Sequence, residues 1–271
     1  MSDDIAIRSL ETPAELAACV ELQRETWGRF FTDAVPASIL KVARKVGGVA
    51  AGAFKDEALI GFVFGISGVR DGNVVHWSDM LAVRPEFQSR GVGRRLKEFQ
   101  RAEVARIGAT EILWTYDPLV ARNAHLNFNV FGVRVVDYVR DMYGDDTGSD
   151  LHSGLGTDRL IVAWPVPDDA LDRMRRRTAA ARVDARFADA PVIGEPAQAP
   201  PEWPAIDRND RLRIAVPGDI HAVLRTRPGD ARQWRTMNRA AFEAATERGY
   251  SVIGFRADTA NDRGHYLLSR S

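Results

Sequence analysis

The sequence has little of several features that would place it in a functional class. Its 271 residues include a single cysteine, Cys19, which excludes an internal disulfide and suits a reducing compartment. Lysine plus arginine and aspartate plus glutamate each number 37, so the net charge favours neither nucleic acid nor a membrane surface. The most apolar stretch, residues 58–66, is far shorter than the roughly 20 residues of a membrane span. We therefore expect no nucleic-acid or membrane partner.

Targeting and metal-binding signals are also scarce. Residues 1–4 carry neither the basic segment nor the apolar core of a secretory signal, and we expect a cytoplasmic protein. The histidines, at positions 76, 125, 152, 221 and 265, show no metal-ligand spacing among themselves or with Cys19, so we predict no metal. Apolar residues make up 45% of the chain and charged residues 27%, which is ordinary for a globular protein.

The most informative segment is a glycine-containing turn between a strand-like run, residues 76–83, and a helix-like run, residues 94–107. A helix N-terminus presents unpaired N–H groups and a partial positive charge, and so binds anions. Gly91 and Gly93 let the backbone approach a diphosphate without a Cβ in the way. We predict a phosphate site formed by Gln88, Ser89, Arg90, Gly91, Val92, Gly93 and Arg94. The alternative is an ordinary strand-to-helix turn.

Two well-known phosphate motifs do not fit this turn. A dinucleotide fingerprint needs a third glycine where Leu96 stands, and a P-loop needs Lys-Ser or Lys-Thr where Arg94-Arg95 stand. The pattern Gln-x-x-Gly-x-Gly, after a strand that ends Leu-Ala-Val-Arg-Pro, resembles the pyrophosphate loop of the GNAT superfamily of acyl-CoA-dependent N-acyltransferases. That resemblance implies acetyl-CoA or another acyl-CoA as co-substrate.

The order of predicted elements agrees with this resemblance over residues 5–164. Strands and helices are expected in the order β-α-α-β-β-β-α-β-α-β-β, which implies an α/β fold with a GNAT-type mixed sheet flanked by helices. Residues 114–119, 122–128 and 156–160 resemble a subgroup of predicted GNAT acyltransferases. Some relatives of that subgroup acylate amino acids, including with succinyl groups.

Three segments are expected along the chain. Residues 1–165 would form the acyl-CoA-binding domain, and residues 166–205 an arginine-rich helix and a proline-rich connector. Residues 206–271 read as a small α+β extension in the order β-α-β-β, too small to be stable alone and therefore docked on the first domain, where it would help shape the acceptor pocket. That order echoes the first half of the GNAT domain, which leaves open whether the extension is a degenerate repeat.

The resemblance also implies how the cofactor arm is held. In the family, the arm pairs with the main chain of the strand before the glycine loop, and the matching residues here are Leu81 and Val83. Asn123, just inside the following helix, matches an asparagine that often helps to hold the arm. A plain polar position in the first helical turn is the alternative for Asn123.

Acyl transfer to an amine needs a base, because an amine with a pKa near 10 is protonated at pH 7. Strand alternation places Trp77, Asp79, Leu81 and Val83 on one side and His76 on the other, and this parity favours Asp79 as the base. A structural hydrogen bond or ion pair is the alternative for Asp79. His76 is the fallback base, with a satisfied strand histidine as its alternative.

The leaving thiolate needs a proton, which family members often take from a tyrosine on the helix after the fifth strand. The matching position here holds Phe128, which has no proton to donate. Tyr116 is the predicted substitute; a strand-end aromatic role for it, or protonation of the thiol by solvent, is the alternative. Arg159 is expected to bind a substrate carboxylate or to pair internally with an acid.

Together these patterns predict an N-acyltransferase that moves an acyl group, most often acetyl, from acyl-CoA to a small-molecule amine, with amino acids among the candidates. The alternatives are a non-catalytic acyl-CoA-binding or regulatory module and a protein acetyltransferase. The sequence leaves the oligomeric state open.

Overall fold

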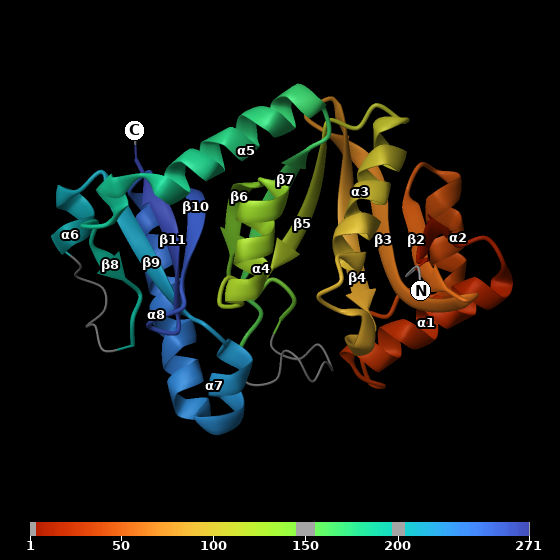
Figure 1. The fold of residues 1–271 in the computed structure, drawn as a ribbon, viewed down its shortest axis with the longest axis horizontal. Coiled ribbons are helices and arrows are strands. Elements are labelled where there is room, and N and C mark those ends of the chain that lie inside the picture. The colour runs from red at the N-terminus through yellow and green to blue at the C-terminus, as the bar shows by residue number, and fades with distance from the viewer. Residues whose placement is uncertain (1–3, 145–154, 197–203, 271) are drawn as a thin grey trace. The chain divides into compact units, whose positions relative to one another are not determined.

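The computed structural model describes residues 4–144, 155–196 and 204–270 (Figure 1). The chain divides into two compact units. The first comprises Met1–Trp114, Asp146–Ser153 and Pro165–Pro167, and the second comprises Thr115–Asp145, Gly154–Trp164 and Asp168–Ser271. The division falls within strand β5 (Glu111–Tyr116), so the residues after that strand group with the C-terminal part of the chain.

The first unit is a mixed sheet with helices. Its strand order is β1-β2-β3-β4-β5, antiparallel except for the parallel pair β4–β5. Its elements are β1 (Ala6–Ser9), α1 (Pro13–Trp27), α2 (Ala37–Lys45), β2 (Val49–Lys55), β3 (Ala58–Arg70), β4 (Asn73–Val83), a 3-10 turn η1 (Pro85–Phe87), α3 (Val92–Ala105) and β5. This order confirms the predicted mixed α/β fold.

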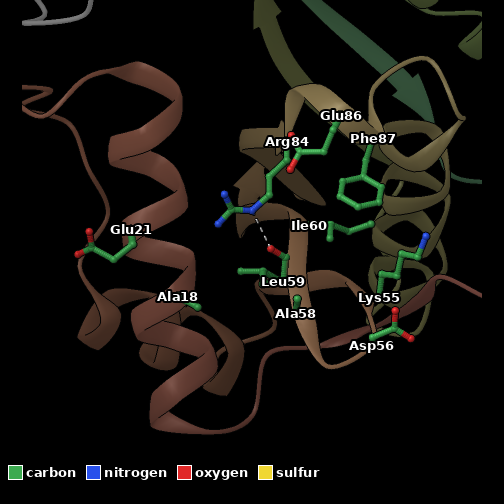
Figure 2. Close-up of a pocket in the computed structure, with 10 residues that line it drawn as sticks. All are labelled: Ala18, Glu21, Lys55, Asp56, Ala58, Leu59, Ile60, Arg84, Glu86 and Phe87. Carbon is green, nitrogen blue, oxygen red and sulfur yellow. Dashed lines mark hydrogen bonds between the residues drawn. The ribbon is translucent and has the colours of Figure 1, made fainter.

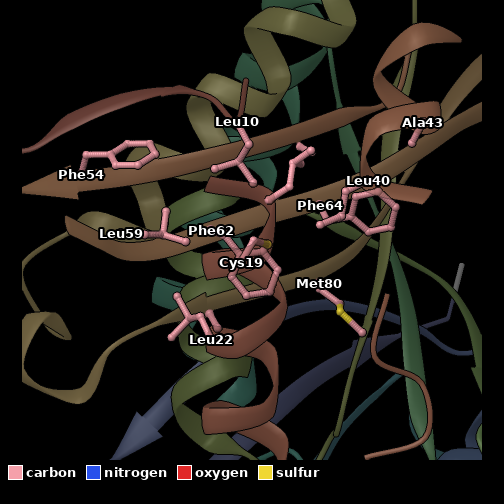
Figure 3. Close-up of a cluster of buried hydrophobic side chains, with 13 residues drawn as sticks. Leu10, Cys19, Leu22, Leu40, Ala43, Phe54, Leu59, Phe62, Phe64 and Met80 are labelled. Atoms are coloured by element: carbon pink, nitrogen blue, oxygen red, sulfur yellow. The ribbon is translucent and has the colours of Figure 1, made fainter. Parts of the chain in front are cut away.

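Helices α1 and α2 cover one face of this sheet. Helix α1 begins with a capping box, in which the Glu15 N–H donates to Thr12 Oγ1 (3.2 Å) and the Thr12 N–H donates to Glu15 Oε2 (3.0 Å). The helices bury leucines against aromatic residues of β3 and against Met80 and Ala82 of β4 (Figure 3). The members of this core include Leu16, Cys19, Leu22, Leu40, Phe54, Phe62 and Phe64. Burial of each such large side chain contributes about 1.5–3 kcal/mol.

The second unit contains an antiparallel strand pair and a four-stranded sheet. The pair is β6 (Arg134–Val139) with β7 (Arg159–Pro165), preceded by α4 (Ala121–His125) and a π-helical turn η2 (Leu126–Phe131). The sheet has the order β10-β11-β9-β8. The elements after β7 are α5 (Asp168–Val183), η3 (Ala185–Phe187), β8 (Val192–Ile193), α6 (Pro204–Arg208), β9 (Arg211–Pro217), α7 (Ile220–Thr226), α8 (Pro228–Glu247), β10 (Ser251–Asp258) and β11 (Arg263–Ser269).

Two aspartates and one glycine set the ends of helices in this unit. Asp117 Oδ1 accepts the Leu119 N–H (2.8 Å) in a tight turn, and helix α4 begins only at Ala121. Asp219 caps α7 by accepting the Ala222 N–H (3.0 Å). Gly132, which adopts φ 74°, follows the end of η2.

The C-terminal part of the second unit contacts the segment that follows β5. The Tyr266 hydroxyl donates to the Pro118 carbonyl (2.7 Å), and its ring meets Phe128 edge-on at 6.0 Å. The resemblance of this part to a half-repeat does not extend to topology. In the first unit the middle strand of β1-β2-β3 is the second in the chain, whereas in β9-β11-β10 the middle strand is the third.

Candidate active site

The predicted phosphate loop lies at the N-terminus of α3. Residues 88–91 are exposed, and the helix begins at Val92 without a side-chain cap, so the N–H groups of its first turn face outward. Gly91, at the N-cap, has φ 78° and open space where a Cβ would stand. Only a glycine or an asparagine-like residue adopts this conformation readily.

Two side chains shape the charge and position of this loop. The Gln88 side-chain amide donates to the Val83 carbonyl (2.9 Å) and ties the loop to the end of β4. Arg94 donates to Glu98 (2.8 Å) in an exposed pair. Exposed pairs contribute little energy, about 0–1 kcal/mol, so Arg94 can exchange Glu98 for a phosphate.

The main chain of Leu81 and Val83 faces an open edge of β4. The Arg84 N–H donates to the Ile60 carbonyl of β3 (2.9 Å), which makes Arg84 a hydrogen-bonded partner of β3. Because bonded and non-bonded pairs alternate in an antiparallel ladder, the N–H and C=O groups of Leu81 and Val83 point away from β3. On that side, the pairing of β4 with β5 ends at Trp77–Leu113 in the described residues.

Beyond Trp77 and Leu113 the two parallel strands therefore diverge, and we call this region the fork. Its β4 arm carries main-chain donors and acceptors that do not pair with β3, of which the Val83 carbonyl accepts from Gln88, and its far end meets the glycine loop. An extended amide-containing chain can add to such an edge by main-chain hydrogen bonds.

A β-bulge lies at Asp79 and corrects the predicted alternation. Phe64 pairs with Met80 and Gly65 pairs with Ser78, which leaves Asp79 as an extra residue in β4. A bulge shifts the side-chain pattern by one residue, so its two flanks no longer share one parity. The side-chain contacts agree: on the α3 face lie His76 and Ser78 before the bulge, but Leu81 and Val83 after it.

The expectation that Asp79 shares a face with Leu81 and Val83 by simple alternation is thus wrong, because the bulge breaks the alternation between them. The Asp79 side chain reaches solvent, yet enough protein surrounds it that burial raises its pKa. A hydrogen bond from Trp77 lowers this pKa in part, and the nearby charge of Asp33 raises it. Bulges are frequent beside active sites because they redirect one side chain.

His76 is held in a closed hydrogen-bond chain. The Ser67 hydroxyl donates to the Gly47 carbonyl (2.7 Å), so it accepts from His76 Nδ1 (2.9 Å), and His76 Nε2 is left to accept from the Gln100 amide (3.0 Å). Burial, and then the charge of Lys97, lower the pKa of His76 to about 3. A histidine whose acceptor nitrogen is already occupied fits the alternative role of a satisfied strand histidine.

The other predicted site residues, Tyr116, Asn123 and Arg159, belong to the second unit, at the end of β5, in the first turn of α4 and at the start of β7. Tyr116 is buried, and burial raises its pKa well above the usual range. Phe128 is also buried.

Arg159 lies in a buried network of ions in the second unit. Its Nη1 donates to the Asp158 carbonyl (2.9 Å) and lies 4.0 Å from Asp117, and its guanidinium lies over the Tyr143 ring. Arg235 of α8 also donates to Asp117 (2.5 Å). The sequence analysis missed Arg235, although an arginine next to Trp234 within the apolar stripe of a helix was a signal that it is buried.

Asp158 forms the second centre of this network. It accepts from Arg239 (2.5 Å), from the Tyr138 hydroxyl (2.5 Å) and from the Asp141 N–H (3.1 Å). Burial alone would raise the pKa of Asp158, but these hydrogen bonds lower it to about 2.

Comparison with known families identifies the region that contains β4 and α3. Residues 16–126 match the acetyltransferase (GNAT) family, a range that contains the glycine loop, the fork and the Asp79 bulge. These residues form a GNAT acetyltransferase domain. The enzyme class is that of the GNAT-family acyl-CoA-dependent N-acetyltransferases. A search of curated proteins found no match to the chain.

Solved structures similar to the chain are also acetyltransferases. The ribosomal-protein-S18-alanine N-acetyltransferase of Escherichia coli is 20% identical, with 60% of this chain and 94% of that chain covered and a TM-score of 0.46. Aminoglycoside 6'-acetyltransferase type Ii is 19% identical, with 60% of this chain and 97% of that chain covered and a TM-score of 0.47. An acetyltransferase from Salmonella typhimurium, solved with acetyl-CoA, is 16% identical, with 60% of this chain and 95% of that chain covered and a TM-score of 0.46.

A surface hollow of the first unit lies away from the fork. It has a volume of about 630 Å³ and is lined by α1, the β2–β3 hairpin and residues 84–87 (Figure 2). Arg84 crosses it and donates to the Leu59 carbonyl (3.1 Å). None of the predicted site residues lines this hollow.

Metal-binding clusters and membrane-spanning helices are both absent from the described residues. No group of three or more histidine, cysteine, aspartate or glutamate side chains in the described part is arranged to hold a metal ion. Within the same residues, no helix has the length and apolar character needed to cross a membrane.

Proposed function

We propose that the chain transfers an acyl group, in the first instance acetyl, from acyl-CoA to the amine of a small molecule, with free amino acids as the first class to test. The observation that carries this proposal is the presence, in one unit, of the uncapped N-terminus of α3 and the free main-chain edge at Leu81 and Val83. Their sequence separation is short, so both belong to one rigid strand-loop-helix segment.

These features fit the chemistry of acyl-CoA. The diphosphate needs several N–H donors and little steric bulk, which the first turn of α3 and Gly91 supply. The pantetheine arm carries amides, which the β4 edge can pair with. Acyl-CoA supplies the activated thioester when it is bound.

Asp79 is the proposed base. It stands at the bulge, where the open edge of β4 begins, and it is exposed, whereas the other residues from Val74 to Val83 are buried or half-buried. Its raised pKa brings the carboxyl closer to neutrality, which makes a carboxylate a stronger proton acceptor. Asp79 would take the proton of the acceptor amine directly or through one water molecule.

Arg159 is the proposed site for a carboxylate on the acceptor. Its planar guanidinium suits bidentate carboxylate binding, and Asp117 at 4.0 Å shows that a carboxylate can lie near it. An acceptor carboxylate would have to compete with Asp117 for this arginine. Internal pairing with Asp117 is thus the competing role, and it would predict no preference for amino acids over simple amines.

The test combines calorimetry with a thiol-release assay. Acetyl-CoA is titrated into the full chain, and thiol release is then followed with free amino acids, simple amines, an aminoglycoside and a peptide with an N-terminal alanine. Turnover with free amino acids supports the proposal. Binding without turnover on any amine would indicate a non-catalytic acyl-CoA-binding module, and turnover on the peptide alone would indicate a protein acetyltransferase.

A further inference from the structure

Lys97 of α3 lies at the point where the fork opens. The last paired residues of β4 and β5 are Trp77 and Leu113, and Lys97 contacts the next residue of each strand. Its ammonium donates to the Ser78 hydroxyl (2.7 Å) and lies 3.8 Å from the centre of the Trp114 ring. A positive charge is therefore placed between the two strands where they separate.

This lysine is buried without a counter-ion. Lys97 is 6% exposed, and no carboxylate forms a salt bridge with it among the described residues. The one titratable neighbour that interacts with it is the neutral His76. Charged residues on the other strands packed against α3 are engaged elsewhere: Arg8 with Glu15, Lys55 with the Phe87 ring and Arg70 with Glu111. A buried, unpaired ammonium is costly and calls for an explanation beyond packing.

The proposed reaction has a role that no other residue described above fills well. Thiol release requires a proton for the sulfur, but Phe128 has none and the Tyr116 hydroxyl is buried with a strongly raised pKa. Both also belong to the second unit, whereas Lys97 shares its helix with the phosphate loop. Five residues separate Lys97 from Val92, the first residue of α3, which corresponds to about 7.5 Å along a helix.

We propose that Lys97 is the proton donor to the coenzyme A sulfur, an inference that rests on the function proposed above. As the carbon–sulfur bond of the thioester breaks and the carbon–nitrogen bond of the amide forms, the Lys97 ammonium gives one proton to the sulfur. The acceptor nitrogen gives its proton to Asp79 or to water. Lys97 regains a proton from solvent, so the cycle needs no other reactant.

The protonation behaviour of Lys97 is compatible with this role. Burial lowers its pKa to about 7, whereas a thiol has a pKa of about 8.5. The two pKa values are close, so a proton can pass from this lysine to a thiolate, and the lysine remains partly protonated near neutral pH. An ordinary exposed lysine, with a pKa of about 10.4, would hold its proton too tightly.

The test measures the ionisation of the thiol of bound coenzyme A, a readout that requires no turnover. The ultraviolet absorbance of the thiolate is followed from pH 5 to 10 for coenzyme A bound to the wild type, to Lys97→Met and to Lys97→Arg. Binding of desulfo-coenzyme A to each protein serves as the control for the rest of the cofactor. We expect the wild type to lower the thiol pKa by about 1–3 units, as a nearby opposite charge does.

The two variants separate a charge effect from proton donation. In Lys97→Met the thiol of bound coenzyme A should no longer have a lowered pKa, while desulfo-coenzyme A should bind as it does to the wild type. Lys97→Arg should keep the lowered thiol pKa but slow thiol release from acetyl-CoA at least tenfold, because arginine does not give up its proton. Thiol release is measured with the best amine of the panel, or with water when no amine reacts.

Three outcomes would overturn the proposal or redirect it. The same thiol titration in wild type and Lys97→Met would contradict it, as would full turnover in Lys97→Arg. Failure of the wild type to bind coenzyme A would instead refute the proposed function. Should Lys97→Met fail to fold, Ser78→Ala replaces it: the loss of this hydrogen bond leaves the lysine in place but unanchored, and an unchanged thiol pKa would then count against the proposal.

Discussion

The two units treat their polar groups in opposite ways. Around β4 in the first unit, the main chain of Leu81 and Val83 faces an unpaired edge, Asp79 reaches solvent, and the first turn of α3 has no side-chain cap. In the second unit, buried acids and arginines satisfy one another, as in the pair Asp158–Arg239. Polar groups left open are ready to bind a ligand, whereas polar groups closed on each other hold a structure together.

The same comparison explains why groups with strongly shifted pKa values occur in both units. Asp158 has a lowered pKa because its hydrogen bonds stabilise the charged form, which is a mark of a structural ion pair. Burial shifts the pKa values of Lys97 and Asp79 in the direction that favours their neutral forms, and hydrogen bonds and charges oppose this shift only a little. Groups of the second kind are the better candidates for proton transfer.

The largest effect is expected in the closed network of the second unit. Arg239→Met leaves the fully buried carboxylate of Asp158 without its main partner, and we expect a loss of about 3–5 kcal/mol in the free energy of unfolding. Arg173→Met, which removes an exposed pair with Asp169, is the matched control and should cost less than about 1 kcal/mol. Urea unfolding measures both losses. Equal losses would show that the buried network contributes no more to stability than an exposed ion pair does.

The same network predicts a pH dependence of stability. Asp158 has a pKa of about 2 in the folded chain, below the roughly 3.9 of an unfolded aspartate. Its contribution to stability is therefore present above about pH 4 and is lost as the pH falls towards 2. Wild-type stability should fall over this range more steeply than that of Arg239→Met, and parallel curves would argue against the assignment.

The next effect concerns Asp79 in the open region. Asp79→Asn keeps the size of the side chain but removes its ability to accept a proton, and turnover should fall by about a hundredfold or more. Affinity for acetyl-CoA, measured by calorimetry, should change little. A decrease of less than threefold across the pH profile would move the role of base to an ordered water, since His76 is already occupied by Gln100.

A smaller effect is expected at the phosphate loop, where the chain offers a matched pair of variants. Gly91 has φ 78° and open space around a Cβ, and both Asn and Asp tolerate this backbone conformation. Gly91→Asp adds a negative charge where phosphates are expected, and coenzyme A affinity should fall at least about tenfold, or about 1.4 kcal/mol. Gly91→Asn should bind nearly as the wild type does; equal affinity of the two variants would mean that no phosphate lies there.

The smallest effect on function is expected at Phe128 in the second unit. Phe128→Tyr places a hydroxyl in the buried contact with Tyr266, so stability should fall by about 1–3 kcal/mol unless a hydrogen bond forms. Turnover should not rise, because the new hydroxyl lies inside a closed aromatic cluster. A clear gain in turnover would show that this position reaches the reacting atoms after all.

The sequence predicted the elements of the first unit well because local signals and the fold agree there. The Thr12–Glu15 cap and the glycine loop are short motifs whose geometry follows from nearby residues. The bulge at Asp79 was not predictable from alternation, because the extra residue is defined by pairing with β3, which is distant in the chain. The parity argument for Asp79 failed for that reason.

Lys97 and the buried arginines show a second limit. The pattern of residues 97, 100 and 104 gives α3 one face, and burial of that face was a usable signal. Nothing in the sequence indicates, however, that Lys97 meets Ser78 and Trp114 on two different strands. Long-range placement of a charged side chain depends on tertiary packing that a local pattern does not encode.

Hydrogen exchange with and without coenzyme A tests the difference between the two units most directly. If the open edge and the loop form the cofactor site, the amides of residues 81–83 and 91–94 will exchange more slowly with saturating coenzyme A, while those of residues 211–217 in the second sheet will not change. Slower exchange at the second sheet alone, or no change at residues 81–94 with coenzyme A bound, would contradict the account.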